Sequence, residues 1–99
     1  MAKAKSITHY RVTDHAQDEM VRRQISVEDV AKVLAAPEQT ETIREGRELY
    51  QILFQSGEPP EPYLLRVFVD VDRVPPEVVT VYRTSKIAKY WRIAHESGL

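Results

Sequence analysis

The sequence predicts an α+β fold with two N-terminal helices, a mainly antiparallel sheet of three to four strands, and a C-terminal helix. Three observations indicate this fold. Apolar residues recur at helical spacing between residues 14 and 36, alternate with a period of two from residue 38 onward, and return to helical spacing after residue 85. Because the connections between the predicted strands are short, we expect mainly antiparallel pairing, with the helices on one face of the sheet.

The first helix is predicted from Asp14 to about Arg23. Asp14 is the expected N-cap, since Gln17 follows three residues later at capping-box spacing. The expected buried side of this helix consists of Ala16, Met20 and Val21. A second helix follows the N-cap Ser26 and ends before Pro37. Its expected apolar stripe consists of Val27, Val30, Val33 and Leu34.

The middle of the chain carries the strand pattern. Strands are predicted at residues 40–43, 48–55, 63–69 and 77–82, preceded by a short extended segment at residues 7–12. Residues 44–47 contain a glycine and form the expected hairpin turn, whereas the proline-containing stretches at 56–62 and 71–76 are loops.

Length and composition indicate one domain, residues 1–99, in which residues 1–6 form a flexible tail. The chain has no cysteine, which excludes a disulfide scaffold, a thiol nucleophile and cysteine-ligated zinc. No stretch is long and apolar enough to cross a membrane, and the charged N-terminus lacks the apolar segment of a signal peptide. We therefore expect a cytoplasmic protein without a membrane partner.

Charge is unevenly distributed along a chain whose net charge is only -1. Residues 28–62 hold eight acidic and three basic residues, whereas residues 78–95 hold four basic residues and no acidic one. The basic stretch includes most of the predicted C-terminal helix, residues 85–97, whose core-facing stripe consists of Ile87, Tyr90, Trp91 and Ala94. Such a stretch either attracts an anion or is the solvated side of a helix. Tyr90 either packs in the core or takes part in the function.

Arg66 is the first candidate functional side chain, because it interrupts the apolar strand at residues 63–69. If the odd-numbered residues of this strand face the core, Arg66 faces the other side of the sheet. On the next strand, Val79 and Val81 are expected to face the core. Thr80 and Tyr82 then lie on the same side as Arg66. A guanidinium there either pairs with a glutamate of a neighbouring strand or binds an anion.

The junction between the last strand and the final helix carries Arg83 and Lys86. A guanidinium can bind two phosphate oxygens, a lysine supplies a point charge, and free amide groups at a helix start attract phosphate. His15, in the first turn of the first helix, is the candidate general base, and Glu19 one turn later favours its charged form. The other two histidines have no partner at ligand spacing, so we expect no metal site.

The two ends of the chain resemble a small bacterial domain family of unknown function. The opening of that family is matched by His15-Ala16, Met20, Arg23, Ile25-Ser26 and Asp29-Val30. Its closing motif is matched by Val79-Thr80-Val81-Tyr82-Arg83-Thr84-Ser85-Lys86 and Lys89-Tyr90-Trp91. The family is similar in layout to the RelE and BrnT toxins, small endoribonucleases with two helices, an antiparallel sheet and a terminal helix. The chain departs from the family pattern at Glu19, where an arginine is expected, and at Gln24, where a glycine is expected.

This resemblance implies a RelE-like fold and a metal-independent endoribonuclease without a cofactor, which leaves a 2′,3′-cyclic phosphate. RNA, including RNA on the ribosome, is the implied substrate, and the candidate protein partners are a cognate antitoxin and a second copy of the chain in a homodimer. The expected catalytic residues are His15, Arg66, Tyr82, Arg83 and Lys86. The expected RNA-binding residues are Arg23, Thr80, Lys89, Tyr90 and Arg92. The alternative is a non-catalytic RNA-binding or protein-interaction module on the same fold.

Overall fold

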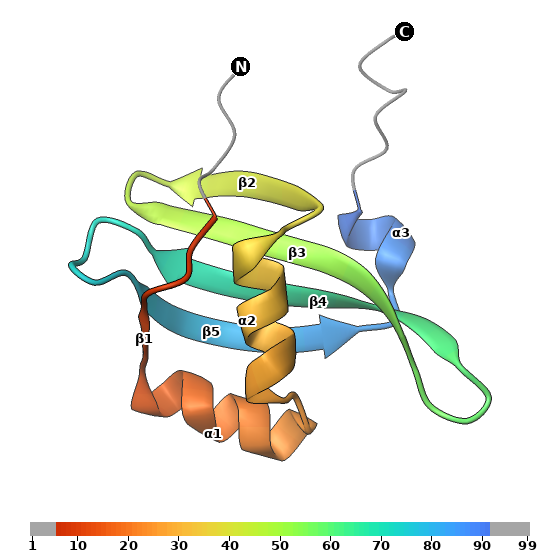
Figure 1. The fold of residues 1–99 in the computed structure, drawn as a ribbon. Helices are drawn as coiled ribbons and strands as arrows, with labels where there is room; N and C mark the ends of the chain where they lie inside the picture. The colour runs from red at the N-terminus through yellow and green to blue at the C-terminus, as the bar shows by residue number, and fades with distance from the viewer. Residues whose placement is uncertain (1–5, 92–99) are drawn as a thin grey trace, which may run out of the picture.

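The computed structural model describes residues 6–91 of the chain (Figure 1). Its elements in chain order are β1 (Arg11–Val12), α1 (Asp14–Arg23), α2 (Val27–Ala35), β2 (Gln39–Arg44), β3 (Arg47–Ser56), β4 (Glu61–Asp70), β5 (Glu77–Thr84) and α3 (Ile87–Tyr90). The predicted α+β class is confirmed. The four predicted strands agree with β2 to β5 to within two residues at each end, because their alternation and the turns between them are local signals.

The strands form one mixed sheet in the order β1-β5-β4-β3-β2. β2 to β5 pair antiparallel with their sequence neighbours, whereas β1 pairs parallel with β5, with Arg11 opposite Glu77 and Val12 opposite Val78. The prediction of three to four mainly antiparallel strands is therefore corrected to five strands with mixed pairing. A strand of two residues is too short to show alternation in the sequence, so only its partner strand defines it.

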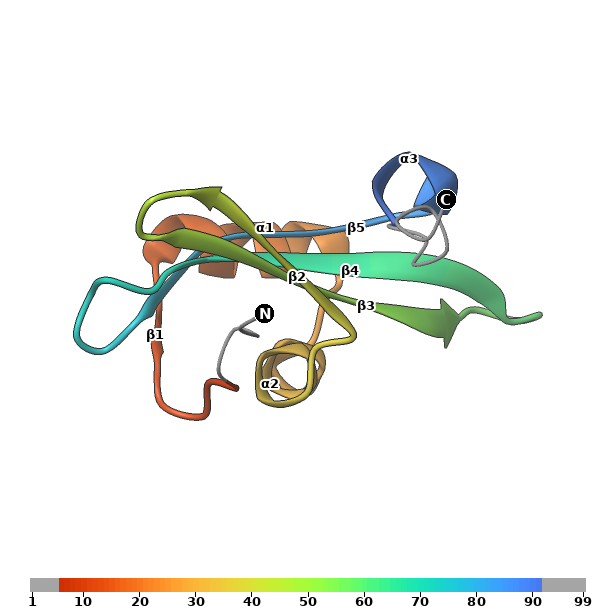
Figure 2. The same ribbon diagram turned by 90° about the horizontal axis from the view of Figure 1, so that it is seen from above.

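The helices of the described chain do not share one face of the sheet, contrary to expectation. Figure 2 shows α2 on one side of the sheet, α3 on the other, and α1 beside the edge formed by β5. α1 is fastened there by Glu19, whose Oε1 accepts a hydrogen bond from the Val81 N–H at 2.9 Å. Beyond the short β1, the outer edge of β5 offers unpaired amides. The Glu19 carboxylate therefore replaces a strand partner at this edge.

Side-chain caps begin the two N-terminal helices. Thr13 Oγ1 accepts a hydrogen bond from the Ala16 N–H at 3.1 Å, so the cap of α1 lies one residue before the predicted one. Ser26 Oγ caps α2 as predicted, by accepting from the Asp29 N–H at 3.0 Å. α1 ends at Gln24, whose φ of 57° lies in the left-handed region that favours glycine. This conformation is a physical reason for the glycine that the resemblance led us to expect here.

The core lies between α2, the inner side of α1 and the facing side of the sheet. Its buried members include Ala16, Met20, Ile25, Val30, Val33, Leu34, Tyr50, Ile52, Leu65, Val67, Val69, Val78 and Val81. Two residues predicted to be buried are exposed instead, Val21 by 78% and Val27 by 67%. In α1 the buried side consists of Ala16, Glu19 and Met20, because the hydrogen bond that Glu19 accepts from β5 sets the rotation of the helix.

A β-bulge changes the faces of β5. Val78 and Thr80 stand opposite consecutive residues of β4, so Val79 is an extra residue between them. Val78 and Val81 are both fully buried in the core. The prediction that Val79 rather than Val78 faces the core was wrong for this reason.

The predicted helix of residues 85–97 is corrected within the described residues, because α3 begins only at Ile87 and Trp91 is already extended. α3 lies on the side of the sheet opposite α2 and has no buried residue, so Ile87 and Tyr90 do not face the core as predicted. Residues 92–97 of the predicted helix, and most of the predicted N-terminal tail, lie outside the described residues. Between residues 6 and 91, no helix has the length and apolar character needed to cross a membrane.

Candidate functional site

Arg66 lies in the middle of the sheet, on the face opposite α2. It stands directly opposite Gln51 of β3 and Tyr82 of β5. Residues directly opposite one another in a sheet share a face, so Tyr82 and, one pair along, Thr80 lie on the face of Arg66 as predicted. Only 6% of the Arg66 residue surface is exposed to solvent. This strand position therefore holds a charge that is nearly removed from water.

Three aromatic rings surround the Arg66 guanidinium. Its Cζ lies 4.1 Å from the ring centroid of Tyr90, and 5.6 Å from the centroids of both Phe68 and Tyr82. The rings of Phe68 and Tyr82 stack with 6.1 Å between centroids, and those of Tyr82 and Tyr90 meet edge to face at 6.4 Å. These contacts stabilise the cation through the negative faces of the rings. We call Arg66, Phe68, Tyr82 and Tyr90 the Arg66 cluster.

No carboxylate of the described chain pairs with Arg66. Its Nε and Nη1 are buried and have no hydrogen-bond partner among residues 6–91. Arg47, on the same face, is paired with a carboxylate in the usual way. Its Nε and Nη2 donate to the two carboxylate oxygens of Asp70 at 2.7 and 3.2 Å. A buried guanidinium with open N–H donors is costly to maintain unless an anion completes it. The Arg66 cluster is therefore a candidate anion-binding site.

Gln51 ties α3 to this face of the sheet. Its Nε2 donates to the Tyr90 carbonyl at 3.3 Å and to Gln39 Oε1 at 2.9 Å. The Gln51 Oε1 is buried beside Arg66 without a partner among the described residues. The site thus combines an amide oxygen, two phenols and a guanidinium.

The pKa values of the two tyrosines of the cluster are shifted in opposite directions. Burial raises the pKa of Tyr82 above its ordinary value of 10.0, although the Arg66 charge opposes this rise. The pKa of Tyr90 is lowered from 10.0, chiefly by Lys89 and further by Tyr82 and Arg66. Two titrating groups whose environments push their pKa values apart are suited to act as acid and base in one reaction.

The basic residues around α3 lie at the rim of this face. Lys89 Nζ lies 5.2 Å from the ring centroid of Tyr90, and its side chain is exposed. Lys86 precedes α3, is exposed, and donates its backbone N–H to Thr84 Oγ1 at 3.0 Å. The described α3 has only four residues, so it offers no extended array of helix amides for a phosphate. Arg92, the remaining predicted RNA-binding residue here, lies outside the described residues.

His15 belongs to a separate cluster on α1. Its Nε2 lies 3.2 Å from Glu19 Oε2, and Arg23 Nη1 lies 3.7 Å from the same oxygen. Glu19 is 7% exposed, because its other oxygen binds the β5 edge. The described contacts bring His15 and Arg23 together through Glu19 and do not join either of them to the Arg66 cluster.

Arg83 lies on the other face of the sheet. It follows Tyr82 directly, and successive residues of a strand point to opposite faces. It stands opposite Leu65, a core residue, and its Cζ lies 5.2 Å from the ring centroid of Tyr63. Arg66 and Arg83, which were predicted to act in one catalytic site, therefore lie on opposite faces of the sheet.

A family comparison assigns residues 12–83 to a domain of unknown function, DUF4258. The chain belongs to this family. No curated protein and no solved structure matches the chain. The DUF4258 match includes Arg66, Phe68 and Tyr82 of the cluster and stops before Lys86, Lys89 and Tyr90.

Two members of the site in this DUF4258 chain were not predicted from the sequence. Phe68 lies two residues from Arg66 on the same strand, so the alternation that placed Arg66 could also have placed this ring beside it. Gln51 carried no comparable signal, because its position opposite Arg66 depends on the register of β3 with β4.

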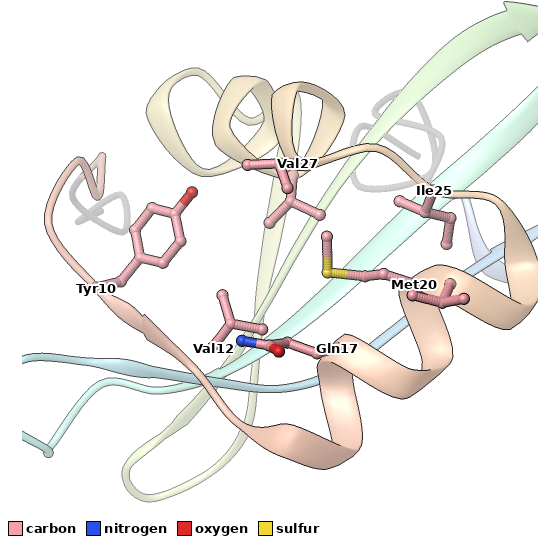
Figure 3. A pocket seen from close by; sticks show the side chains of 8 residues that line it. Tyr10, Val12, Gln17, Met20, Ile25 and Val27 are labelled. Carbon is pink, nitrogen blue, oxygen red and sulfur yellow. The ribbon is translucent and has the colours of Figure 1, made fainter.

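The DUF4258 domain also has an apolar cavity of about 290 Å³ between β1, α1 and α2 (Figure 3). Its lining includes Met20, Ile25 and the exposed Val27, with Tyr10 and Gln17 at its polar end. Among residues 6–91, no group of three or more His, Asp or Glu side chains is arranged to hold a metal ion.

Proposed function

We propose that this DUF4258 protein is a metal-independent endoribonuclease of the RelE and BrnT type that acts on RNA at the Arg66 cluster. The single observation that carries the proposal is the buried, unpaired guanidinium of Arg66, enclosed by two tyrosines whose pKa values are shifted in opposite directions. Phosphodiester cleavage in RNA needs a cation for the charge of the transition state and a matched acid and base. The chain ends resemble a domain family that is similar in layout to that toxin group, and this likeness in layout supports the same proposal.

The proposed reaction uses groups on one face of the sheet. The ribose 2′-hydroxyl attacks the adjacent phosphorus and gives its proton to the phenolate form of Tyr90, the tyrosine that ionises more readily. The P–O5′ bond breaks, and Tyr82, which holds its proton more firmly, donates that proton to the departing 5′-oxygen. Arg66 donates its free N–H groups to the phosphate oxygens as negative charge accumulates. The products are a 2′,3′-cyclic phosphate and a 5′-hydroxyl.

Access to Arg66 requires the Tyr90 ring to move. This ring lies 4.1 Å from the guanidinium, on a helix of four residues held to β3 by the 3.3 Å hydrogen bond from Gln51. A phosphate that enters replaces a ring contact with charge-assisted hydrogen bonds, which are stronger. Lys86 and Lys89, exposed at the rim, attract the RNA backbone, and Thr80 lies beside the cluster as a further contact.

The test is cleavage of single-stranded RNA by the purified protein in the presence of a metal chelator, with the product ends identified. Arg66→Met, Tyr82→Phe and Tyr90→Phe are each expected to lower the cleavage rate about 10²- to 10⁴-fold. Arg11→Met is the control, because this exposed arginine on β1 pairs only with Glu77 in the described chain. Unchanged cleavage by Arg66→Met would refute the proposal. His15→Ala and Arg83→Ala, at the two predicted catalytic positions away from the cluster, measure whether either acts in the reaction.

The proposed partners follow from the same function. In a cell, expression of the protein is expected to arrest growth, and Arg66→Met is expected to relieve the arrest. A cognate antitoxin encoded in the adjacent reading frame would restore growth on co-expression. RNA on the ribosome is the proposed substrate if arrest coincides with cleavage of translated messages.

A non-catalytic protein-interaction module is the second candidate function. The observation that favours it is the apolar cavity between α1 and α2, at whose lining Val21 and Val27 are strongly exposed. Salt separates the candidates: log affinity for single-stranded RNA falls with log salt by about 0.7 per phosphate contacted. An affinity that does not depend on salt would favour a protein partner, including a second copy of the chain.

A further inference from the structure

A second aromatic and basic group lies on the face of the sheet that carries α2. Tyr63 of β4 stands opposite Phe54 of β3, with ring centroids 6.0 Å apart. The Arg83 guanidinium of β5 lies 5.2 Å from the Tyr63 ring centroid. All three side chains are half-buried. Phe54, Tyr63 and Arg83 therefore form a row across three strands, which we call the Tyr63 row.

The Tyr63 row is only partly covered, since Phe54 packs against the core while all three side chains keep part of their surface exposed. Figure 1 shows the hairpin of β3 and β4 projecting beyond α1 and α2 at the end where β5 finishes. Phe54 and Tyr63 lie on this projecting part, near the turn that joins Ser56 to Glu61. Arg83 has no ion pair with a carboxylate among residues 6–91. Its charge is thus free to attract an anion.

Arg23 extends this basic surface toward the edge of the sheet. α1 runs beside β5 in the same direction, since the Thr13 N–H donates to the Val78 carbonyl and Glu19 binds the Val81 N–H. Arg23 lies one helical turn beyond Glu19, about 6 Å along α1. Arg83 lies two residues beyond Val81, about 6.6 Å along β5. The two arginines therefore reach the same level at the C-terminal end of β5.

We propose that Arg23, Arg83 and Tyr63 form a second contact surface for single-stranded RNA, on the opposite face of the sheet from the Arg66 cluster. This inference rests on the proposed function. A guanidinium held over a phenol ring presents a flat surface on which an unpaired base can stack. Arg23, whose side chain is 41% exposed and whose Nη1 also lies 3.7 Å from Glu19 Oε2, supplies a cation for the neighbouring phosphate. Double-stranded RNA would offer no unstacked base to this surface.

The direction of the bound strand follows from nearby charges. Glu61 shares the face of Tyr63, two residues closer to the hairpin turn, and Glu58 lies in that turn. Both carboxylates repel phosphate, so the strand is expected to leave the Tyr63 row toward Arg23. Tyr82 and Arg83 are consecutive residues on opposite faces, so a strand that passes the end of β5 reaches both surfaces.

The experiment is a binding titration with a fluorescent single-stranded RNA whose 2′-O-methyl groups prevent cleavage. Tyr63→Leu and Arg83→Met are each expected to weaken binding about tenfold or more, and Tyr63→Phe is expected to retain it, because the ring rather than the hydroxyl stacks. Tyr10→Leu is the control, since this half-buried tyrosine lies beside β1. Thermal unfolding confirms that each variant is folded before it is titrated.

This experiment tests the proposed functions of the two surfaces independently. If Arg66→Met weakens binding while Tyr63→Leu and Arg83→Met bind as the unaltered protein does, the second surface is refuted and the proposed function stands. If Tyr63→Leu weakens binding while Arg66→Met leaves both binding and RNA cleavage unchanged, the proposed function is refuted and the Tyr63 row remains as an RNA-contact surface. Crosslinking of an RNA that contains a photoreactive uridine is expected to mark Tyr63, and a crosslink confined to Tyr82 or Tyr90 would overturn the inference.

Discussion

Replacing Arg66 by methionine tests whether this residue serves the fold or the function. Loss of an arginine that has a structural role destabilises a protein, because the groups that it was paired with are left unpaired. The structure predicts the opposite for Arg66, since no described carboxylate depends on it and its Nε and Nη1 are themselves unpaired. Methionine has a similar length, and its thioether packs well against aromatic rings.

The expected magnitude follows from the contacts of the side chain. Each buried N–H donor without a partner costs about 1–3 kcal/mol. Contacts between a cation and aromatic rings recover about 0.5–2 kcal/mol, and a methionine among the same rings recovers about 0.3–1.5 kcal/mol. Because Arg66 has two such donors, the balance predicts that Arg66→Met leaves the free energy of unfolding unchanged or raises it by at least about 1 kcal/mol. A gain of that size would raise Tm by about 4–8 °C.

Arg47→Met is the matched comparison, because Arg47 lies on the same face and donates twice to Asp70. Its loss leaves a mostly buried carboxylate without its partner and is expected to cost about 1–2 kcal/mol. Thermal and denaturant unfolding of both variants measure the difference, and RNA cleavage is assayed on the same samples. The expected result is a stable, inactive Arg66→Met and a destabilised, active Arg47→Met.

The reasoning fails if Arg66→Met loses as much stability as Arg47→Met. That result would mean that the aromatic rings require the cation between them, and Arg66 would then be a packing residue. If Arg66→Met changes neither the stability nor the cleavage rate, Arg66 does not bind the substrate phosphate. The expectation for its effect on stability would still hold.

Three further outcomes are expected from other parts of the fold. Glu19→Ala should destabilise the protein by about 1–3 kcal/mol and speed hydrogen exchange at the Val81 amide, because that buried N–H loses its acceptor. Asp18 is exposed on the same helix, so the control Asp18→Ala should change neither the stability nor the exchange rate. Gln24→Gly should raise the free energy of unfolding by about 0.5–1 kcal/mol in a denaturant titration, since the φ of 57° strains a residue with a side chain; a loss of stability would contradict this account. The Arg47 guanidinium lowers the pKa of Asp70 from its ordinary value of 3.8. The stability that this carboxylate contributes is therefore complete above pH 3.8 and is lost as the pH falls below it. Asp70→Asn should flatten the acid side of a plot of Tm against pH.

Much of the secondary structure could be predicted from local signals. The Ser26 cap and the Asp14–Arg23 helix depend on residues within one or two turns of each other, and those contacts hold in any tertiary setting. The hairpin turn at Gly46 likewise has the φ of 86° that only a glycine adopts readily. β1 was not predicted as a strand of the sheet, because a pair of residues becomes a strand only beside a partner from the far end of the chain.

The site was predicted in part for the same reason. Alternation along β4 and β5 correctly placed Arg66 with Tyr82. The grouping of Arg66 with Arg83 and His15 required residues from β4, β5 and α1 to converge on one site. The pleat sends Arg83 to the opposite face, and the Glu19 contact with β5 holds His15 on α1.

The sequence by itself determined the α+β class, the N-terminal helices, the hairpin strands and the face on which Arg66 lies, because spacing and caps encode them locally. Only the tertiary structure decided what surrounds Arg66: the register of β3 brings Gln51 beside it, and the return of α3 sets Tyr90 over it. It also decided that Val78 is buried, through a bulge that periodicity does not reveal. Contacts between distant segments depend on the relative placement of whole elements, and that placement follows from packing of the entire core.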